Sequence, residues 1–286
     1  MEESVSSLPT LPASILPMKI YGLDFTSAPR LRKPVTCAIG AVFDARLYLE
    51  DLCVFANFTV FEEFLNQSGP WLAGLDFPFG QPKKLIQNLG WPASWEDYMR
   101  EVVRLGKSGF EQTLAAYRQS RPQGDKQHLR TADIRAKSRS PMMWYGVPVG
   151  RMFFEGAPRL LKAGVNVLPC RPNGDTRIVI EAYPALVARR WASSYKNDTK
   201  KKQTAVQEMA RRAIIAGIRS DQLQEIYGFS VELSDTLAIS LIQDPSGDRL
   251  DAVLCAIQAT WAYRHNFAVP PECDPQEGWI FDPKLL

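Results

Sequence analysis

Two copies of the tetrapeptide Gly-Leu-Asp-Phe each place an aspartate at the end of a short apolar run. The first aspartate is Asp24, in MKIYGLDFTSAP, and the second is Asp76, in WLAGLDFPFGQP. If both runs are parallel strands, the two carboxylates lie side by side at the carboxyl edge of the sheet, where ligands bind. Adjacent buried carboxylates repel each other, so either one of them is protonated or a positive group stands between them, and a divalent cation is the usual solution. The pair therefore predicts a site for Mg²⁺ or Mn²⁺, both of which take oxygen ligands.

Three further acids stand where they can join this pair. Glu181 ends the apolar run RIVIE in the same manner. Asp248 and Asp251, in GDRLDAVLCAIQATWA, are spaced i, i+3 and so share one face at the start of a predicted helix. Small residues on one stripe of that helix would let it approach a sheet closely. The stripe consists of Ala252, Cys255, Ala256 and Ala259.

Convergent carboxylates of this kind indicate hydrolysis of phosphodiester bonds with two divalent ions about 3.5–4 Å apart. In this hypothesis Asp24, on the central strand, bridges the two ions. Asp76 holds the ion on one side, and Asp251, with Asp248, holds the ion on the other. Glu181 is either a further ligand or a base that orients the attacking water. We therefore expect the catalytic residues to be Asp24, Asp76, Glu181 and Asp251, and the metal-binding residues to be Asp24, Asp76, Asp248 and Asp251.

Each acid also has a purely structural interpretation. An aspartate before Pro or Ser often forms a turn, which applies to Asp24 and Asp76. Asp248 suits the N-cap of a helix, and Asp251 suits the first turn, where the helix dipole favours negative charge. Glu181 can pair with an arginine of the following segment ARRW.

Basic and polar segments elsewhere are open to two interpretations. The run KNDTKKK, residues 196–202, is either a solvated loop or a contact for a phosphate backbone. Arg130, Asp133, Arg135 and Arg139 either line the mouth of a site or only solvate a loop. Neither segment contains a motif that decides between its two interpretations.

Composition places few limits on function. The chain has 286 residues, of which 45% are hydrophobic and 23% charged, as is ordinary for a soluble globular protein. Its net charge of +3 permits a nucleic acid or nucleotide substrate without requiring one. Five cysteines without a CxxC pair indicate reduced thiols in a cytoplasmic protein. We expect no membrane span, because no apolar stretch reaches the roughly 18 residues that a span needs.

Apolar runs and turn residues predict the elements that must position the acids. Three strands, at 18–24, 35–43 and 47–55, form an antiparallel meander. A short helix at 59–66 then leads to a fourth strand at 71–77. Because a helix joins them, the fourth strand is expected to lie parallel to the first.

The second half of the chain completes an α/β fold. A largely helical insertion, about 81–175, separates the fourth strand from a fifth at 177–181, and helices follow to the end. The result is a mixed five-stranded sheet in the order 3-2-1-4-5, flanked by helices, which is the ribonuclease-H-like arrangement. We expect one such domain over residues 18–286, after a flexible tail at 1–17.

Several motifs, in this order along the chain, resemble those of a known family. GLDFTSAP, AGLDFPFG, VIEAYPALVAR, GDRLDAVLCAIQATWA and EGWIFDP are similar to motifs of the predicted ribonuclease-H-like nucleases of domain-of-unknown-function family 429. The similarity runs from about Lys19 to Pro283 and includes VPVGRMFFEGAPRLL. The segment DRLDA also resembles the last-helix signature of Holliday-junction resolvases of the same fold. The resemblance implies a ribonuclease-H-like fold and an acidic metal site at Asp24, Asp76, Glu181 and Asp251.

Three functions remain for these residues. The favoured one is a divalent-metal-dependent nuclease or phosphodiesterase. The second is a phosphotransferase of the actin and sugar-kinase type. In that type the first strand also ends in an aspartate before a Thr/Ser phosphate loop, as Asp24 does before Thr26 and Ser27. Against it, the chain lacks a glycine-rich adenosine motif and room for two such domains. The third is a non-catalytic nucleic-acid-binding member of the fold, in which the acids serve as caps and ion-pair partners. The sequence leaves open whether the substrate is DNA, RNA or a small nucleotide, and what the oligomeric state is.

Overall fold

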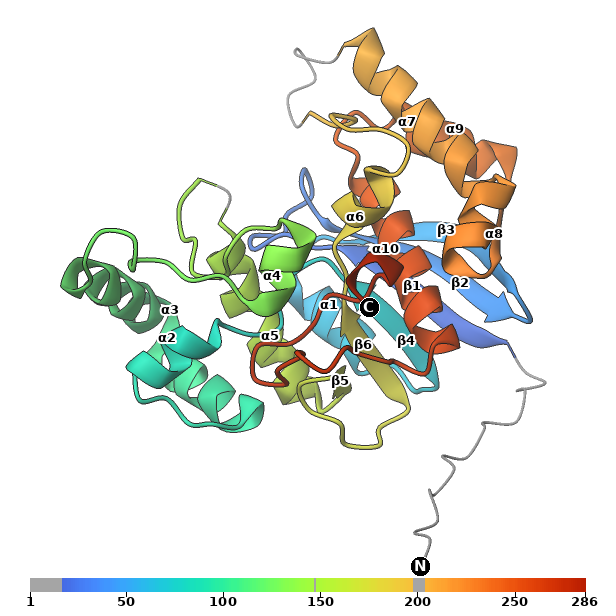
Figure 1. Cartoon of the computed structure of the whole chain (residues 1–286). Helices are drawn as coiled ribbons and strands as arrows, with labels where there is room; N and C mark the ends of the chain where they lie inside the picture. The colour runs from blue at the N-terminus through green and yellow to red at the C-terminus, as the bar shows by residue number, and fades with distance from the viewer. Residues whose placement is uncertain (1–16, 147, 198–203) are drawn as a thin grey trace, which may run out of the picture.

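The computed structural model describes residues 17–146, 148–197 and 204–286. Apart from Pro17, the expected flexible tail at 1–17 lies outside the described residues, and so do residues 198–202 of the basic run. The described chain is an α/β protein in which helices cover both faces of a central sheet (Figure 1).

The central sheet is mixed and seven-stranded. Its strands are β1 (Met18–Asp24), β2 (Val35–Phe43), β3 (Arg46–Phe55), β4 (Trp71–Leu75), β5 (Asn166–Leu168), β6 (Arg177–Glu181) and β7 (Ser230–Leu233). They lie in the order β5-β6-β4-β1-β2-β3-β7. β1, β2 and β3 form the expected antiparallel meander, and β4 lies parallel to β1 as expected. β6, β5 and β7 are also added in parallel, to β4, β6 and β3 respectively.

The expectation of a five-stranded sheet is wrong, because the sheet has seven strands. The five expected strands are all present, and their order, β3-β2-β1-β4-β6, is the expected one. The sequence analysis missed the two edge strands, β5 and β7, which have only three and four residues. Runs this short do not show the alternation by which strands are recognised. Since β5 lies within 81–175, the insertion contributes one edge of the sheet.

Ten helices surround the sheet in the described ranges. They are α1 (Phe58–Leu65), α2 (Lys83–Asn88), α3 (Trp95–Ser120), α4 (Thr131–Ala136), α5 (Val149–Ala163), α6 (Pro184–Ala188), α7 (Ala205–Ile218), α8 (Asp221–Tyr227), α9 (Asp235–Gln243) and α10 (Asp248–Arg264), and a 3-10 turn follows at Pro283–Leu285. The insertion, α2 to α5, lies on the left in Figure 1, and α7 to α9 lie at the upper right. Across the part of the chain described, no helix combines the length and apolar character needed to cross a membrane.

Each face of the sheet carries its own hydrophobic core. On one face, Ile20 of β1 and Leu72 of β4 pack with α7, α8, α9 and α10. On the other face, Tyr21 and Leu23 pack with α1, α3 and α5. Because side chains alternate along a strand, Asp24 lies on the same face as Ile20, toward α10.

Helix α10 rests directly on the sheet because glycines face it. Gly22 and Gly74 are register partners in β1 and β4. A Cβ atom on Gly22 would stand 2.0 Å from the carbonyl oxygen of Ala252, and one on Gly74 would stand 2.5 Å from that of Cys255. Only glycine therefore permits this contact between backbones. The small-residue stripe expected on this helix does meet the sheet.

The two Gly-Leu-Asp-Phe segments, 22–25 and 74–77, lie side by side in the parallel pair β1–β4. Their glycines and their leucines are register partners, and their phenylalanine rings lie 4.5 Å apart between centroids. The N–H of Asp76 donates a hydrogen bond of 3.0 Å to the carbonyl oxygen of Leu23. Each glycine allows α10 to approach the sheet closely. Each aspartate lies two residues further along, on the same face of the sheet as α10. The repeated tetrapeptide is thus one structural device used twice.

The glycine contact predicts a large stability loss for Gly22→Ala, because the added methyl group meets the α10 backbone and not a side chain that can move. We expect the free energy of unfolding to fall by about 3 kcal/mol, measured by urea denaturation followed by circular dichroism. The matched control is Gly109→Ala, where the new methyl group would lie 3.4 Å from Leu105 in α3, an ordinary contact. It should stabilise the protein by roughly 0.5–1 kcal/mol, as alanine does in a helix. Equal effects of the two substitutions would contradict this account of α10.

Candidate functional site

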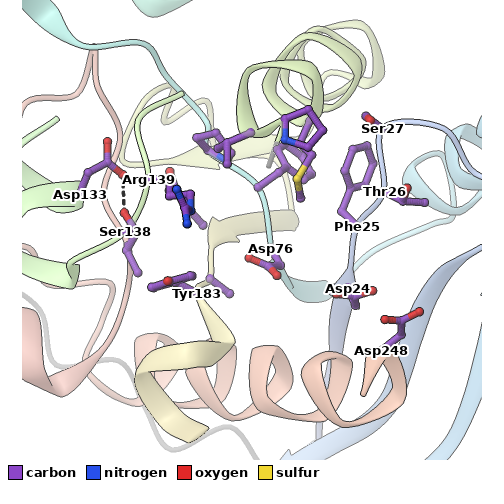
Figure 2. A pocket seen from close by; sticks show the side chains of 18 of the residues that line it. Asp24, Phe25, Thr26, Ser27, Asp76, Asp133, Ser138, Arg139, Tyr183 and Asp248 are labelled. Carbon is purple, nitrogen blue, oxygen red and sulfur yellow. Dashed lines mark hydrogen bonds between the residues drawn. The ribbon is translucent and has the colours of Figure 1, made fainter. Parts of the chain in front are cut away.

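A cavity of about 820 Å³ opens at the carboxyl ends of β1, β4 and β6. Asp24, Asp76 and Asp248 line it, together with Glu181 and Lys196. Figure 2 shows Asp24 and Asp76 at the ends of adjacent strands, with Asp248 at the start of the helix that crosses beneath them. This edge is where open α/β sheets bind ligands, so the cavity is the candidate functional site.

The insertion forms the opposite wall of the cavity. Arg130, Asp133 and Arg139 line this wall, so these three belong to the site's surroundings. Asp133 also accepts a hydrogen bond of 2.7 Å from the hydroxyl of Ser138, which is drawn in Figure 2. The fourth residue of the predicted set, Arg135, forms an ion pair with Glu272.

The two strand-end aspartates hold protons more tightly than isolated carboxyls. Burial, and then the negative charges of the neighbouring acids, Asp251 first, raise the pKa of Asp24 well above its usual value. Burial and the charge of Asp251 raise the pKa of Asp76 to about 7. Lys196 opposes both shifts with its positive charge. Lys196 therefore offsets only part of the effect of burial and neighbouring charge on these two aspartates.

The two acids of α10 differ in their surroundings. The N-cap of this helix is Gly247, so Asp248 is the first helical residue and lines the cavity. Asp251, one turn further, is 0% exposed, and its carboxylate accepts hydrogen bonds from the Tyr195 hydroxyl and the Lys196 ammonium. Asp248 thus faces the cavity, whereas the buried carboxylate of Asp251 already accepts hydrogen bonds from Tyr195 and Lys196.

Glu181 lies on the insertion side of the cavity. Its register partner Leu75 belongs to the core beneath the insertion, so alternation places Glu181 on the face opposite to Asp24. Its two oxygens accept hydrogen bonds from Arg130 at 2.6 and 2.7 Å, and one oxygen also accepts from the N–H of Phe79 at 2.9 Å. Burial raises the pKa of Glu181, and the charge of Arg130 counteracts this. The ion-pair partner is thus Arg130 and not an arginine of ARRW, and the catalytic role of Glu181 stays a prediction.

The ion pair between Arg130 and Glu181 is part of a fully buried network. Arg130 is 1% exposed and also donates to both oxygens of Asp133, at 2.8 and 2.9 Å. The Nη1 atom of Arg130, which donates to Glu181, also donates to the carbonyl oxygen of Glu277 at 3.0 Å. Because every charge here has a close partner, the network joins the insertion and the C-terminal segment to β6.

The donor chemistry of the site fits a hard divalent cation. Within 17–146, 148–197 and 204–286, no three His, Cys, Asp or Glu side chains are already grouped so as to coordinate a metal ion. Asp24 and Asp76 nevertheless offer carboxylate oxygens from adjacent strand ends, and these are the ligands that Mg²⁺ and Mn²⁺ prefer. Their pKa values are raised by burial first and then by the neighbouring negative charges, and a bound cation would offset the second of these causes.

The sequence analysis did not identify Tyr195 and Lys196 as partners of the acids. Lys196 was noted only as the first residue of a basic run, and Tyr195 precedes that run. Asp251 lies 55 residues from Lys196 in the chain, and no motif joins the two. In the sequence, the only indication of this contact was the presence of Lys196 as the first residue of the basic run.

The fold and the cavity define an α/β protein whose parallel strands end in an acidic site. The chain belongs to the family described as "Protein of unknown function (DUF429)", whose model matches residues 24–275. The match confirms the resemblance to domain-of-unknown-function family 429, and it contains all five acids of the predicted site. Neither a curated protein nor a solved structure matches the chain significantly.

The raised pKa of Asp76 predicts that Asp76→Asn stabilises the protein at neutral and alkaline pH. In the unfolded chain this carboxyl ionises near pH 3.8, whereas the folded protein keeps the proton until about pH 7. Between these values the folded state binds more protons than the unfolded state, so its free energy of unfolding falls as the pH rises. Asparagine, which carries no titrating proton, removes this loss.

The expected gain grows with pH up to about 7 and then stays constant. At about 1.4 kcal/mol per pH unit it has an upper limit of ~4 kcal/mol, and we expect ~2 kcal/mol at pH 8 because the cavity admits solvent. Urea denaturation at pH 5 and pH 8, with a chelator present, measures it. Asp44→Asn, at the exposed turn between β2 and β3, is the matched control. A gain that is the same at both pH values would show that Asp76 does not titrate in this range.

Proposed function

We propose that this protein is a divalent-metal-dependent phosphodiesterase that acts as a nuclease on nucleic acid or on a nucleotide. The observation that carries the proposal is the position of Asp24 and Asp76, on adjacent parallel strands at the mouth of one cavity. The antiparallel meander followed by parallel strands, in the order β3-β2-β1-β4-β6, supports a ribonuclease-H-like fold for it.

Asp24 and Asp76 would hold Mg²⁺ or Mn²⁺, with Asp248 at the edge of the same cluster. A bound ion of this kind polarises a phosphoryl oxygen and lowers the pKa of its water. The carboxylates must be ionised to serve as ligands, so their raised pKa values make ion binding stronger as the pH rises.

Other side chains of the cavity suit a phosphate ester. Lys33, Arg139 and Lys196 line it and can contact phosphate oxygens. Pro148 and Met152, on the insertion side, offer apolar surface against which a base or ribose can pack. In the reaction a bond forms between the water oxygen and phosphorus, the ester P–O bond breaks, and the leaving oxygen takes up a proton. The cavity thus combines groups for the phosphate with groups for the rest of a nucleotide.

A second candidate rests on the loop that follows β1. The side chains of Thr26 and Ser27 line the cavity directly after Asp24 (Figure 2), as a phosphate loop would in an actin- or sugar-kinase-like phosphotransferase. Such a protein would bind ATP and transfer its terminal phosphoryl group to an acceptor. A rise in melting temperature with ATP and Mg²⁺, without cleavage of any phosphodiester, would favour this candidate.

The main test is cleavage by Asp24→Asn and Asp76→Asn variants. We expect Mn²⁺-dependent cleavage of single-stranded DNA, duplex DNA, RNA or a small aryl phosphodiester by the wild type, and its loss by roughly 100-fold or more in each variant. Each substitution removes a carboxylate charge without changing the side-chain shape. Asp44 lies in the turn between β2 and β3, beside the start of β1 and so at the ends of the strands away from the cavity. Asp44→Asn should therefore cleave at the wild-type rate. Thermal melting verifies that all variants are folded, and wild-type rates in both site variants would refute the mechanism.

A further inference from the structure

Lys196 differs from the other basic residues of the cavity in its contact with a buried acid. Its ammonium forms an ion pair with the carboxylate of Asp251. The lysine side chain is 45% exposed, whereas that of Asp251 is 0% exposed. The side chain therefore runs from the mouth of the cavity down to an acid that solvent does not reach.

Hydrogen bonds to the backbone fix the segment that carries this lysine, residues 195–197. Arg211 donates a hydrogen bond of 2.8 Å to the carbonyl oxygen of Tyr195. Gln207 donates one of 3.1 Å to the carbonyl oxygen of Lys196. The N–H of Asn197 donates a hydrogen bond of 3.1 Å to the carbonyl oxygen of Pro245. Arg211 is itself buried and donates to the carbonyl oxygen of Ile242 at 2.7 Å. The loop is thus held from two sides, by α7 and by the turn before α10.

The N-cap of α10 is shaped for the passage of the lysine side chain. Gly247 has φ +76°, and a Cβ atom there would stand 2.8 Å from Cβ of Lys196. A larger residue would be strained by its backbone angle and would push the lysine away from the helix. The glycine therefore allows Lys196 to cross the start of α10 and reach Asp251.

The Lys196 charge acts on the whole acid cluster. It lowers the pKa values of Asp24 and Asp76, and all three side chains line the same cavity. Although burial lowers the pKa of Lys196, the charges of Asp251 and Asp24 raise it above the usual value. The side chain thus remains an ammonium at any physiological pH.

We propose that the Lys196 ammonium takes the place of the second metal ion, holding Asp251 while a single divalent ion binds at Asp24 and Asp76. The inference rests on the proposed function for the single ion, and it replaces the second ion of the two-ion hypothesis with a side chain. An ammonium has three N–H donors, so Lys196 can contact Asp251 and a phosphate oxygen at once. It would stabilise negative charge that develops on the phosphate during cleavage.

The number of bound ions tests this directly. Titration calorimetry and electron paramagnetic resonance with Mn²⁺ should count one ion per chain in the wild type and two in Lys196→Met. Methionine keeps an unbranched side chain of similar length but has no charge, so it leaves the Asp251 oxygen that Lys196 had contacted to a second ion, while Tyr195 still donates to the other oxygen. Lys196→Arg keeps the charge and should bind one ion. Arg139→Met removes a charge from the same cavity without touching Asp251 and should also bind one ion.

Two results would overturn the role of Lys196 while leaving the proposed function intact: two ions in the wild type, or a single ion in Lys196→Met. No Mn²⁺ binding by any of these proteins would instead contradict the proposed function, and this inference with it. Circular dichroism establishes whether each variant folds. If Lys196→Met does not fold, the wild-type count still decides, because the two-ion alternative requires two ions there.

Discussion

The contact between the backbone of α10 and the glycine pair of β1 and β4 is the constraint on which the site depends. Because no side chain separates helix from sheet at Gly22 and Gly74, these two glycines set how closely α10 approaches β1 and β4. Both aspartates of the repeated tetrapeptide lie two residues beyond those glycines, on the same face. The first turn of α10 therefore arrives beside them and brings Asp248 and Asp251. The positive end of the helix dipole favours negative charge at that turn, so helix and strands contribute acids to one point.

Two groups of buried charges meet in this cavity, and they differ in how well they are compensated. In the first group, Arg130 joins both Glu181 and Asp133 through short hydrogen bonds, so each acid has a direct ion-pair partner, although burial still raises the pKa of Glu181. In the second group, the charge of Lys196 is shared among several acids, and the pKa values of Asp24 and Asp76 remain raised. Perturbed carboxyls in a cleft are typical of functional sites, since stability alone would favour their replacement. The first group therefore holds the insertion in place, with the catalytic role of Glu181 still a prediction, and the second group is the main candidate for chemistry.

Much of the fold could be predicted because its strongest signals are local. The apolar runs that end in Asp24, Asp76 and Glu181 became β1, β4 and β6, and the central strand order followed from the helical crossover. The edge strands β5 and β7 were missed because three or four residues show no periodicity and are strands only through their neighbours. Their existence depends on pairing with β6 and β3, which no local pattern reveals.

The acids of the candidate site could be predicted from the sequence, but their partners could not. The repeated tetrapeptide and the i, i+3 spacing of Asp248 and Asp251 indicated which acids the fold collects. The partners of those acids were not predictable, because they come from loops distant in sequence: Arg130 meets Glu181 across 51 residues, and Lys196 meets Asp251 across 55. Such contacts depend on how the insertion and the loop before α7 pack, which composition and periodicity do not determine.

The most direct measurement of the central claim is anomalous diffraction from a crystal of the wild-type protein soaked in Mn²⁺ at pH 8, which is above the pKa of about 7 of Asp76. The account predicts an anomalous peak coordinated by the carboxylate oxygens of Asp24 and Asp76. A fully soaked crystal with no peak at these two side chains, or with manganese bound only elsewhere, would contradict it.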